Sequence, residues 1–143
     1  MASYDSGTLT NQSSRSARIY KDLNLDFQQN TATKDIQKIT DVESVKRSVR
    51  NLINLNHYEK PFHPEISGGV RELLFEHMNP MTSVVIARKI EDVINNFEPR
   101  CRLVSVRAIP DYDKNAYNVS VEFYVVNAPT ELVDLSVMLE RLR

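Results

Sequence analysis

The segment "NNFEPRCRL", residues 95–103, places an acid and a base on either side of a proline. Proline fixes one backbone dihedral angle, so in an extended run Glu98 and Arg100 project toward the same side with little freedom. An oriented charge pair loses less entropy on binding, and the planar guanidinium of Arg100 can bind a carboxylate or carbonyl groups. The pattern predicts a docking element for a protein partner; the alternative is a helix end followed by exposed charges.

Paired carboxylates would be needed for glycosidase chemistry, and Glu91, Asp92 and Glu98 are the candidates. Adjacent Glu91 and Asp92 point in different directions from a helix, and no spacing forces two acids to face one substrate. The sequence also lacks the G-x-S-x-G, P-loop and dinucleotide-binding motifs. We therefore expect no catalytic residues and no enzymatic activity.

Metal chemistry is not expected either. His57, His63, His77 and Cys101 show neither the i, i+4 histidine pairing nor the paired-cysteine spacing of zinc sites. Cys101 is the only cysteine, so no internal disulfide can form and a reducing compartment fits the chain. The sequence predicts no metal and no cofactor.

The composition and net charge of the chain limit the classes of partner that it is expected to bind. The chain is 41% hydrophobic and 26% charged, which is typical of a soluble globular protein, and its net charge of −1 provides no attraction to a nucleic-acid backbone. No stretch is apolar and long enough to span a bilayer, and the first 18 residues contain no apolar core of a secretion signal. We expect neither nucleic acid nor a membrane as a partner, and synthesis in a cytosol-like setting.

The first 18 residues are rich in Ser, Thr, Asn and Gln, which predicts a flexible N-terminal arm over residues 1–18 and a single domain over residues 19–143. In the segment that follows the arm, Leu23, Leu25 and Phe27 alternate with polar residues. This alternation predicts a short extended stretch that drapes over the domain, or simply an ordered loop.

A first helix is expected from Thr40, because Thr40 and Glu43 fit a capping box. Lys46, Arg47 and Arg50 form a basic face that either is solvated or meets an acidic partner. The opposite, apolar face of this helix consists of Val42, Val45, Val49, Leu52 and Ile53.

Two prolines and two glycines in "NHYEKPFHPEISGG" end this helix and predict a loop that acts as a fixed plug. A short helix, "GVRELLFEHM", follows and ends at Asn79-Pro80. Thr82 is expected to cap a third helix, "TSVVIARKIEDVINNF", whose exit is expected at Glu98, the residue before Pro99.

After Arg100 the period changes from helical to alternating. The segments "CRLVSVRAIP" and "YNVSVEFYVV" predict an antiparallel hairpin joined by the turn "PDYDKNA", and the hairpin's outer backbone groups could accept a strand from another chain. The tail alternates as a strand at Val133, Leu135, Val137 and Leu139, but the leucines at 132, 135, 139 and 142 are spaced as in a helix. A third strand is favoured, because a hairpin alone is marginally stable. The predicted class is α+β, with three helices packed on a small, mostly antiparallel C-terminal sheet.

Several stretches together resemble a known family. "KPFHPEISGGVRELLFEHMNPMT" (Lys60 to Thr82), the following helix, "FEPR" (Phe97 to Arg100) and the paired strands after it resemble the baseplate wedge and sheath-initiator proteins of contractile-tailed, T-even-like phages. This GPW-like family also has members in type VI secretion baseplates. The resemblance covers roughly residues 40–140.

The resemblance implies a structural virion protein of the tail baseplate, assembled in the host cytoplasm. It implies that Phe97, Glu98, Pro99 and Arg100 dock on the helical core bundle of other baseplate wedge subunits. It also implies that the segments 101–109, 118–126 and 133–140 template the tail sheath protein by strand exchange, with Val133, Leu135, Val137 and Leu139 as partner-binding positions.

Two alternatives remain open at this point. One is a tail-associated peptidoglycan hydrolase, lysozyme-like, which would need an indispensable carboxylate. The other is a host regulatory protein built on the same fold that binds another adaptor without forming a tail; an intact Glu-Pro-Arg element argues against it.

Overall fold

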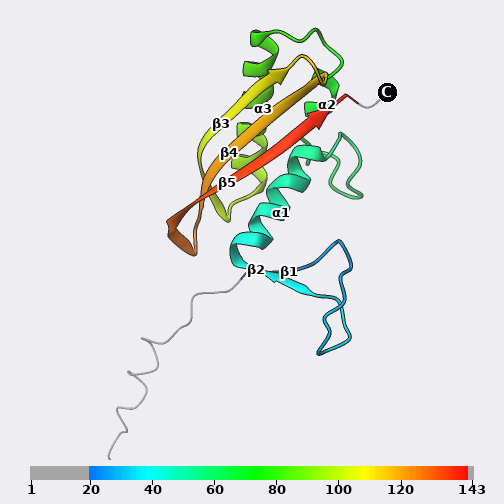
Figure 1. Ribbon diagram of the computed structural model, residues 1–143, viewed down its shortest axis with the longest axis vertical. Helices are drawn as coiled ribbons and strands as arrows, with labels where there is room; N and C mark the ends of the chain where they lie inside the picture. The colour runs from blue at the N-terminus through cyan, green and yellow to red at the C-terminus, as the bar shows by residue number, and fades with distance from the viewer. Residues whose placement is uncertain (1–19, 142–143) are drawn as a thin grey trace, which may run out of the picture.

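The computed structural model describes residues 20–141, and the predicted α+β class is confirmed. This part of the chain contains three helices, a two-stranded antiparallel sheet and a three-stranded antiparallel sheet at the C-terminal end (Figure 1). The arm predicted for residues 1–18 lies outside the described residues. The elements are, in chain order, β1 (Lys21–Leu23), β2 (Lys38–Thr40), α1 (Asp41–Asn54), α2 (Val70–Leu73), α3 (Pro80–Phe97), β3 (Cys101–Asp111), β4 (Ala116–Val125) and β5 (Ala128–Glu140).

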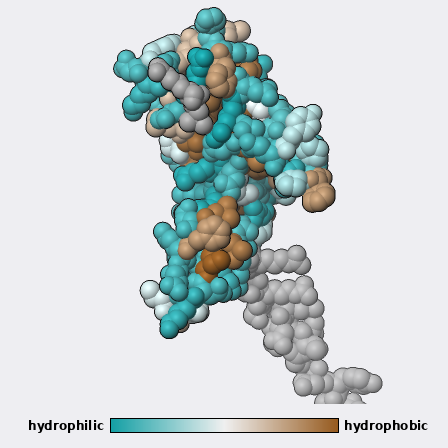
Figure 2. Space-filling view, turned by 90° about the vertical axis from the view of Figure 1, so that its right-hand side faces the viewer, coloured by the Kyte–Doolittle hydropathy of each residue, from teal (hydrophilic) through white to brown (hydrophobic). Residues whose placement is uncertain are grey.

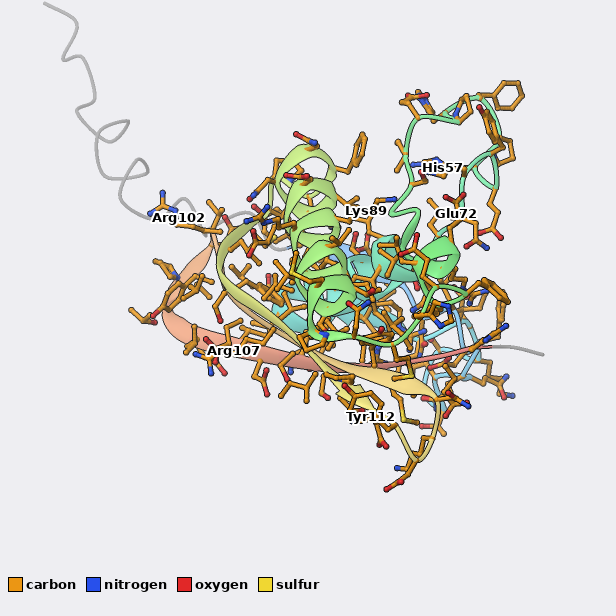
Figure 3. All side chains as sticks on the ribbon, turned by 90° about the horizontal axis from the view of Figure 1, so that it is seen from above. His57, Glu72, Lys89, Arg102, Arg107 and Tyr112 are labelled. Carbon is orange, nitrogen blue, oxygen red and sulfur yellow. The ribbon has the colours of Figure 1, made fainter. Side chains whose placement is uncertain are left out.

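The C-terminal sheet has the strand order β3–β4–β5, so the predicted hairpin and the favoured third strand are both confirmed. Its two faces differ because side chains alternate along each strand. The inward side chains of β4 (Val119, Val121, Phe123 and Val125) are fully buried, whereas Glu122 on the other face is partly exposed. Figure 3 shows the helices on one side of this sheet, so the core lies between that side and the helices α1 and α3.

The start of α1 differs from the predicted capping box. Thr40 occupies the N-cap position, but its side chain makes no capping hydrogen bond. Thr40 is also the last residue of β2, where it pairs with Lys21 of β1. The N–H of Asp41, the first residue of α1, donates to the carbonyl of Tyr20 (2.8 Å), so the main chain beside β1 supplies an acceptor for one of the N–H groups that have no partner within the helix.

The N-cap of helix α3 lies three residues earlier than predicted. Asn79, and not Thr82, is its N-cap: the side chain of Asn79 accepts a hydrogen bond from the N–H of Thr82 (2.7 Å). Pro80 is tolerated at the first helical position because that N–H would have no partner within the helix. Pro80 serves both as the end of the preceding helical segment and as the first residue of α3, and a sequence pattern that ends one helix at this proline does not reveal its second role.

The loop between α1 and α2 is not the plug that its prolines suggested. Tyr58 is 83% and Phe62 97% exposed, so these aromatic rings fill no space in the core. The base of the loop is fixed instead, since the N–H of buried Gly68 donates to the carbonyl of Leu55 (3.2 Å). Gly69 precedes α2 with a φ of 53°, which few other residues adopt without strain.

The segment 21–40 forms a hairpin-like arm, which we call the β1–β2 arm, and it extends beside the start of α1 (Figure 1). The extended stretch is confirmed, but its draping over the domain is wrong. Leu23, Leu25 and Phe27 are 58%, 53% and 72% exposed, because β1 pairs with β2 and does not lie on the core.

Candidate docking site at the end of helix α3

Helix α3 ends where the sequence predicted. Glu98 has a φ of −125° and a ψ of 76°, outside the helical region, as expected for the residue before a proline. Its N–H still donates to the carbonyl of Ile94 (2.9 Å), which completes the last turn. The side chain of Glu98 turns back into the protein and is only 3% exposed, whereas Pro99 lies on the surface.

Glu98 and Arg100 project toward the same side and form a two-point ion pair. Arg100 Nε donates to Glu98 Oε1 (2.7 Å), and Arg100 Nη2 donates to Glu98 Oε2 (2.9 Å). Such a fork is among the stronger pairings of charged side chains because both hydrogen bonds are charge-assisted. The pair is therefore an ordered unit of the folded chain.

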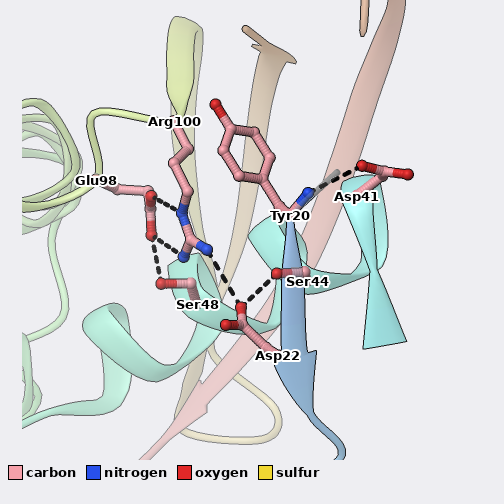
Figure 4. Close-up of polar contacts among 7 residues, drawn as sticks. All are labelled: Tyr20, Asp22, Asp41, Ser44, Ser48, Glu98 and Arg100. Carbon is pink, nitrogen blue, oxygen red and sulfur yellow. Dashed lines mark hydrogen bonds and ion pairs between the residues drawn. The ribbon is translucent and has the colours of Figure 1, made fainter. Parts of the chain in front are cut away.

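Residues from α1 and β1 fix this pair in place (Figure 4). The hydroxyl of Ser48 donates to Glu98 Oε2, and Arg100 Nη1 donates to Asp22 Oδ2 (3.2 Å). Asp22 also accepts a hydrogen bond from the hydroxyl of Ser44. We call these five residues the Arg100 cluster; the ring of Tyr20 adds a cation–π contact, with Arg100 Cζ 5.6 Å from the ring centroid.

The electrostatics of the cluster favour the ionised pair. Burial would raise the pKa of Glu98, but the hydrogen bonds from Arg100 and Ser48 outweigh it, so the pKa of Glu98 is lowered. The hydrogen bond to Glu98 raises the pKa of Arg100 further above its ordinary value. At neutral pH the cluster thus holds a carboxylate and a guanidinium.

The two charged residues differ in what another chain could reach. The Arg100 side chain is 26% exposed and that of Glu98 only 3%. A partner can therefore contact Arg100, Pro99 and the half-buried Phe97, while Glu98 holds Arg100 in position. The partner-binding role of these residues remains a prediction.

Sequence reasoning missed Asp22, Ser44 and Ser48. The two serines are four residues apart, so they lie on one face of α1, and a polar pair next to an apolar stripe is a signal that could have been noticed. Asp22 lies 78 residues before Arg100, and only the folding of β1 beside α1 brings the two together.

The predicted partner-binding side chains of β5 point toward the core. Val133, Leu135, Val137 and Leu139 are buried, with exposures of 4%, 4%, 7% and 2%. Their side chains are therefore occupied within the chain. What β5 can offer a partner is the main chain of an outer strand of the sheet and its outward side chains.

The catalytic and metal candidates are dispersed. Glu91 lines a groove between α3 and β3, whereas Glu98 faces Ser48 of α1, so these two acids do not share a cavity. Burial raises the pKa of the Cys101 thiol to about 11, so it is not a thiolate at neutral pH. Among residues 20–141 no group of three His, Cys, Asp or Glu side chains could hold a metal ion. None of the helices in this part of the chain has the length and apolar character needed to cross a membrane.

Comparison with known proteins finds relatives of this chain among the structural subunits of contractile-tail baseplates. A family model described as baseplate wedge protein gp25 matches residues 40–130. The chain is 29% identical over 122 residues to baseplate wedge protein gp25 of Enterobacteria phage T4, which covers 85% of this chain and 92% of the T4 protein.

Two solved structures share the fold. A candidate tail lysozyme from Geobacter sulfurreducens has a TM-score of 0.64 at 22% identity, over 71% of this chain and 91% of its own. A chain of the anti-feeding prophage baseplate has a TM-score of 0.60 at 18% identity, over 87% of this chain and 88% of its own. At these identities the likeness shows the fold alone.

The chain belongs to the baseplate wedge protein gp25 family, since the family model matches more than half of it. It is accordingly a structural protein of the phage tail baseplate, and the family resemblance noted in the sequence is confirmed.

Proposed function

We propose that this baseplate wedge protein joins the wedge to the start of the tail sheath. Its segment from Phe97 to Arg100 docks on the helical core bundle of other wedge subunits, and its C-terminal sheet templates polymerisation of the tail sheath protein by strand exchange. The observation that carries the proposal is the ordered, partly exposed guanidinium of Arg100 beside the exposed Pro99.

Arg100 retains hydrogen-bonding capacity for a partner. A guanidinium has five N–H donors, and the hydrogen bonds to Glu98 and Asp22 use three of those on Arg100. The other two donors have no acceptor within residues 20–141, and a carboxylate or a pair of carbonyl groups would satisfy them. Because Glu98 already fixes the guanidinium, little side-chain entropy is lost when a partner binds.

Apolar contact would accompany the hydrogen bonds. Phe97 is half-buried and Pro99 is exposed, so both present apolar surface next to Arg100. Interfaces combine such an apolar centre with a few oriented polar groups. The arrangement suits a partner surface with an apolar patch and one acceptor group.

The strand-exchange part of the proposal assigns the added strand to β5. Both β3 and β5 are outer strands of the sheet. β3 has a register shift between Leu103 and Ser105 and a proline at position 110, two features that protect a strand from pairing with other chains. β5 pairs regularly with β4 from Leu132 to Glu140 and contains no proline in that stretch, so its outer edge is the longer regular template.

The charges beside β5 indicate what kind of strand fits. Lys46, Arg47 and Arg50 of α1 line a groove of about 240 Å³ together with Glu43 of α1 and with Asp134 and Ser136 of β5. Lys46 is paired with Glu43 and Arg47 with Asp26, which leaves Arg50 without an ion pair among residues 20–141. A strand added to β5 would run over this groove, so one with a carboxylate on its inner face would complement Arg50. The basic face of α1 thus acquires an acidic partner in this proposal.

The proposal is tested by affinity purification of the tagged protein from phage-infected cells, with the co-purifying chains identified by mass spectrometry. Wild type should recover wedge and sheath subunits. Replacement of the charge pair by Glu98→Ala with Arg100→Ala should abolish recovery of the wedge subunits, since loss of partnered interface charges typically costs about 2–5 kcal/mol.

The control is Arg88→Ala with Asp92→Ala, which removes an exposed base and an exposed acid from α3 away from the Arg100 cluster. It should bind as wild type does. Thermal unfolding followed by circular dichroism separates lost docking from lost folding, because Glu98 is buried. A wild-type protein that recovers no wedge subunits, or that degrades peptidoglycan, would overturn the proposal.

A further inference from the structure

Helix α3 carries two apolar stripes, and the core uses only one of them. The buried stripe includes Ile86 and Ile90, which are fully enclosed. A second stripe consists of Pro80, Val84 and Ala87, whose spacing of four and then three positions puts them on one face of the helix. Val84 is 49% exposed, so residues 20–141 leave this second stripe partly uncovered.

The second stripe forms one wall of a groove of about 520 Å³ between α3 and β3. Because β3 returns along α3 after the turn at Pro99, the start of the helix lies beside the end of the strand. The wall formed by β3 includes Pro110 and Ile109, and Ile109 is 61% exposed. We call this space, between residues 80–91 of α3 and residues 106–110 of β3, the α3–β3 groove.

Farther along α3 the lining of the groove becomes charged. Arg88 of α3 and Arg107 of β3 both line it, and Figure 3 shows Arg107 on the opposite side of α3 from Lys89. Neither arginine forms an ion pair with a residue among 20–141, and Glu91, in the same lining, is also unpaired there. Two cations against one anion leave a positive charge that the described part of the chain does not neutralise.

The shape of the groove suits a helix better than a strand. β3 has a register shift between Leu103 and Ser105 and a proline at position 110, which protect its edge from strand addition. Pairing with that edge would also leave the stripe on α3 uncovered. A helix packs along such a row of side chains, and the small Ala87 in its middle allows a close approach of the two axes. The wall formed by α3 covers about three helical turns.

We propose that the α3–β3 groove binds an amphipathic helix of another baseplate protein, about three turns long. The apolar stripe of that helix packs on Val84 and Ile109, as in other complexes in which a helix fills an apolar groove. A carboxylate on the helix accepts hydrogen bonds from Arg88 and Arg107. That the partner belongs to a baseplate follows from the family of the chain. Neither interface proposed above uses this groove.

Charge argues against a second copy of this chain as the occupant. The exposed face of its helix α1 carries the basic residues Lys46, Arg47 and Arg50. The uncovered face of its helix α3 carries Arg88 itself. Either helix would bring arginine against arginine in the groove, which disfavours the complex. The groove therefore selects an acidic helix of a different protein.

The test identifies what lies in the groove of the assembled baseplate. The photo-crosslinking amino acid p-benzoylphenylalanine replaces Val84 in tagged protein produced in phage-infected cells, purified baseplates are irradiated, and cross-linked peptides are identified by mass spectrometry. The expected peptide belongs to another baseplate chain and has apolar residues at helical spacing together with an aspartate or glutamate. The control carries the same amino acid at Phe62, in the loop between α1 and α2. This loop projects from the face shown in Figure 2, on the other side of α3 from β3, and should not yield that peptide.

Charge reversal tests the two arginines. Arg88→Glu with Arg107→Glu should lower the yield of the Val84 cross-link at least about 10-fold, because the carboxylate of the partner is then repelled. Both side chains are exposed, so the variant should fold, which circular dichroism checks. Lys38→Glu with Lys60→Glu makes the same change in net charge at exposed positions outside the groove and should leave the yield unchanged.

The outcomes separate this inference from the docking proposal. A Val84 cross-link to a second copy of this chain, to a peptide without an acidic residue or to no chain would overturn the inference. An unchanged yield in the charge-reversal variant would overturn it too. Wild type that recovers the wedge subunits without a Val84 cross-link contradicts the groove alone. Glu98→Ala with Arg100→Ala that still recovers them contradicts the docking proposal alone.

Discussion

The Arg100 cluster and the strand β5 are built for contact in opposite ways. In the cluster one side chain, Arg100, is presented to the outside, and buried groups hold it in position. In β5 the inward side chains are used by the core, and the main chain of the outer edge is what remains for a partner. A side-chain site selects a partner by geometry and charge, whereas a main-chain edge accepts many sequences.

This difference fits the two proposed partners. A wedge subunit must be recognised once and in one orientation, which a fixed guanidinium can achieve. A sheath strand need only have an extended backbone, with side chains that alternate between the two faces of the sheet. The same chain can therefore combine a selective contact with a permissive one.

The largest expected effect tests whether the inward side chains of β5 belong to the core. Leu135→Ala should lower the free energy of unfolding by about 2–5 kcal/mol, the cost of truncating a buried leucine. Urea unfolding at neutral pH measures it. Met138→Ala, on the same strand but 47% exposed, should change stability by less than about 1 kcal/mol. Equal effects would place Leu135 outside the core.

A smaller effect is expected from the cluster. Glu98→Gln keeps the size of the side chain and its contact with Ser48 but removes the charge that faces Arg100. The free energy of unfolding should fall by about 1–3 kcal/mol, as for a charged hydrogen bond that is partly buried. Glu91→Gln, on α3 and outside the cluster, should stay within about 0.5 kcal/mol of wild type. An unchanged free energy of unfolding in Glu98→Gln would show that the ion pair does not stabilise the fold.

The pH dependence of stability isolates the same pair. Because the pKa of Glu98 is lowered in the folded protein, the stabilisation is present above the ordinary pKa of a glutamate, about 4.3, and is lost as the pH falls below it. Urea unfolding from about pH 6 to pH 3 should show a steeper loss of stability for wild type than for Glu98→Gln. Parallel curves would assign the acid sensitivity to other carboxylates.

The smallest effect on folding is expected at the edge of β5. Ser136→Glu adds a negative charge to an exposed position beside the groove that is proposed to take an acidic strand, so stability should change by less than about 0.5 kcal/mol, whereas strand addition should be impaired. The rate at which sheath polymerisation begins on purified baseplates measures the second effect. Ile109→Glu, at an exposed position of the other outer strand, is the control and should leave the rate unchanged. Equal impairment by both variants would contradict the assignment to β5.

Much of the fold could be predicted from local patterns. Val119, Val121, Phe123 and Val125 alternate on β4, and their burial follows from the two-residue period of a strand. The exit of α3 at Glu98 followed from Pro99, since proline restricts the residue before it wherever it stands. The failures were at ends and loops: Asn79 replaced Thr82 as a cap, and Phe62 lies in solvent. Caps and loop positions depend on groups that a periodic pattern does not contain.

The sequence by itself determined the class, the elements and the residue types at the end of α3, because periodicity, proline geometry and the order of motifs are local properties. It predicted that Glu98 and Arg100 share a side. Only the tertiary structure decided that Glu98 is buried, that Asp22 and Ser48 complete the Arg100 cluster, and that the β1–β2 arm borders a groove beside Arg100. These contacts join residues 50 and 78 positions apart in the chain, and burial is a property of the packed fold that spacing along the chain does not express.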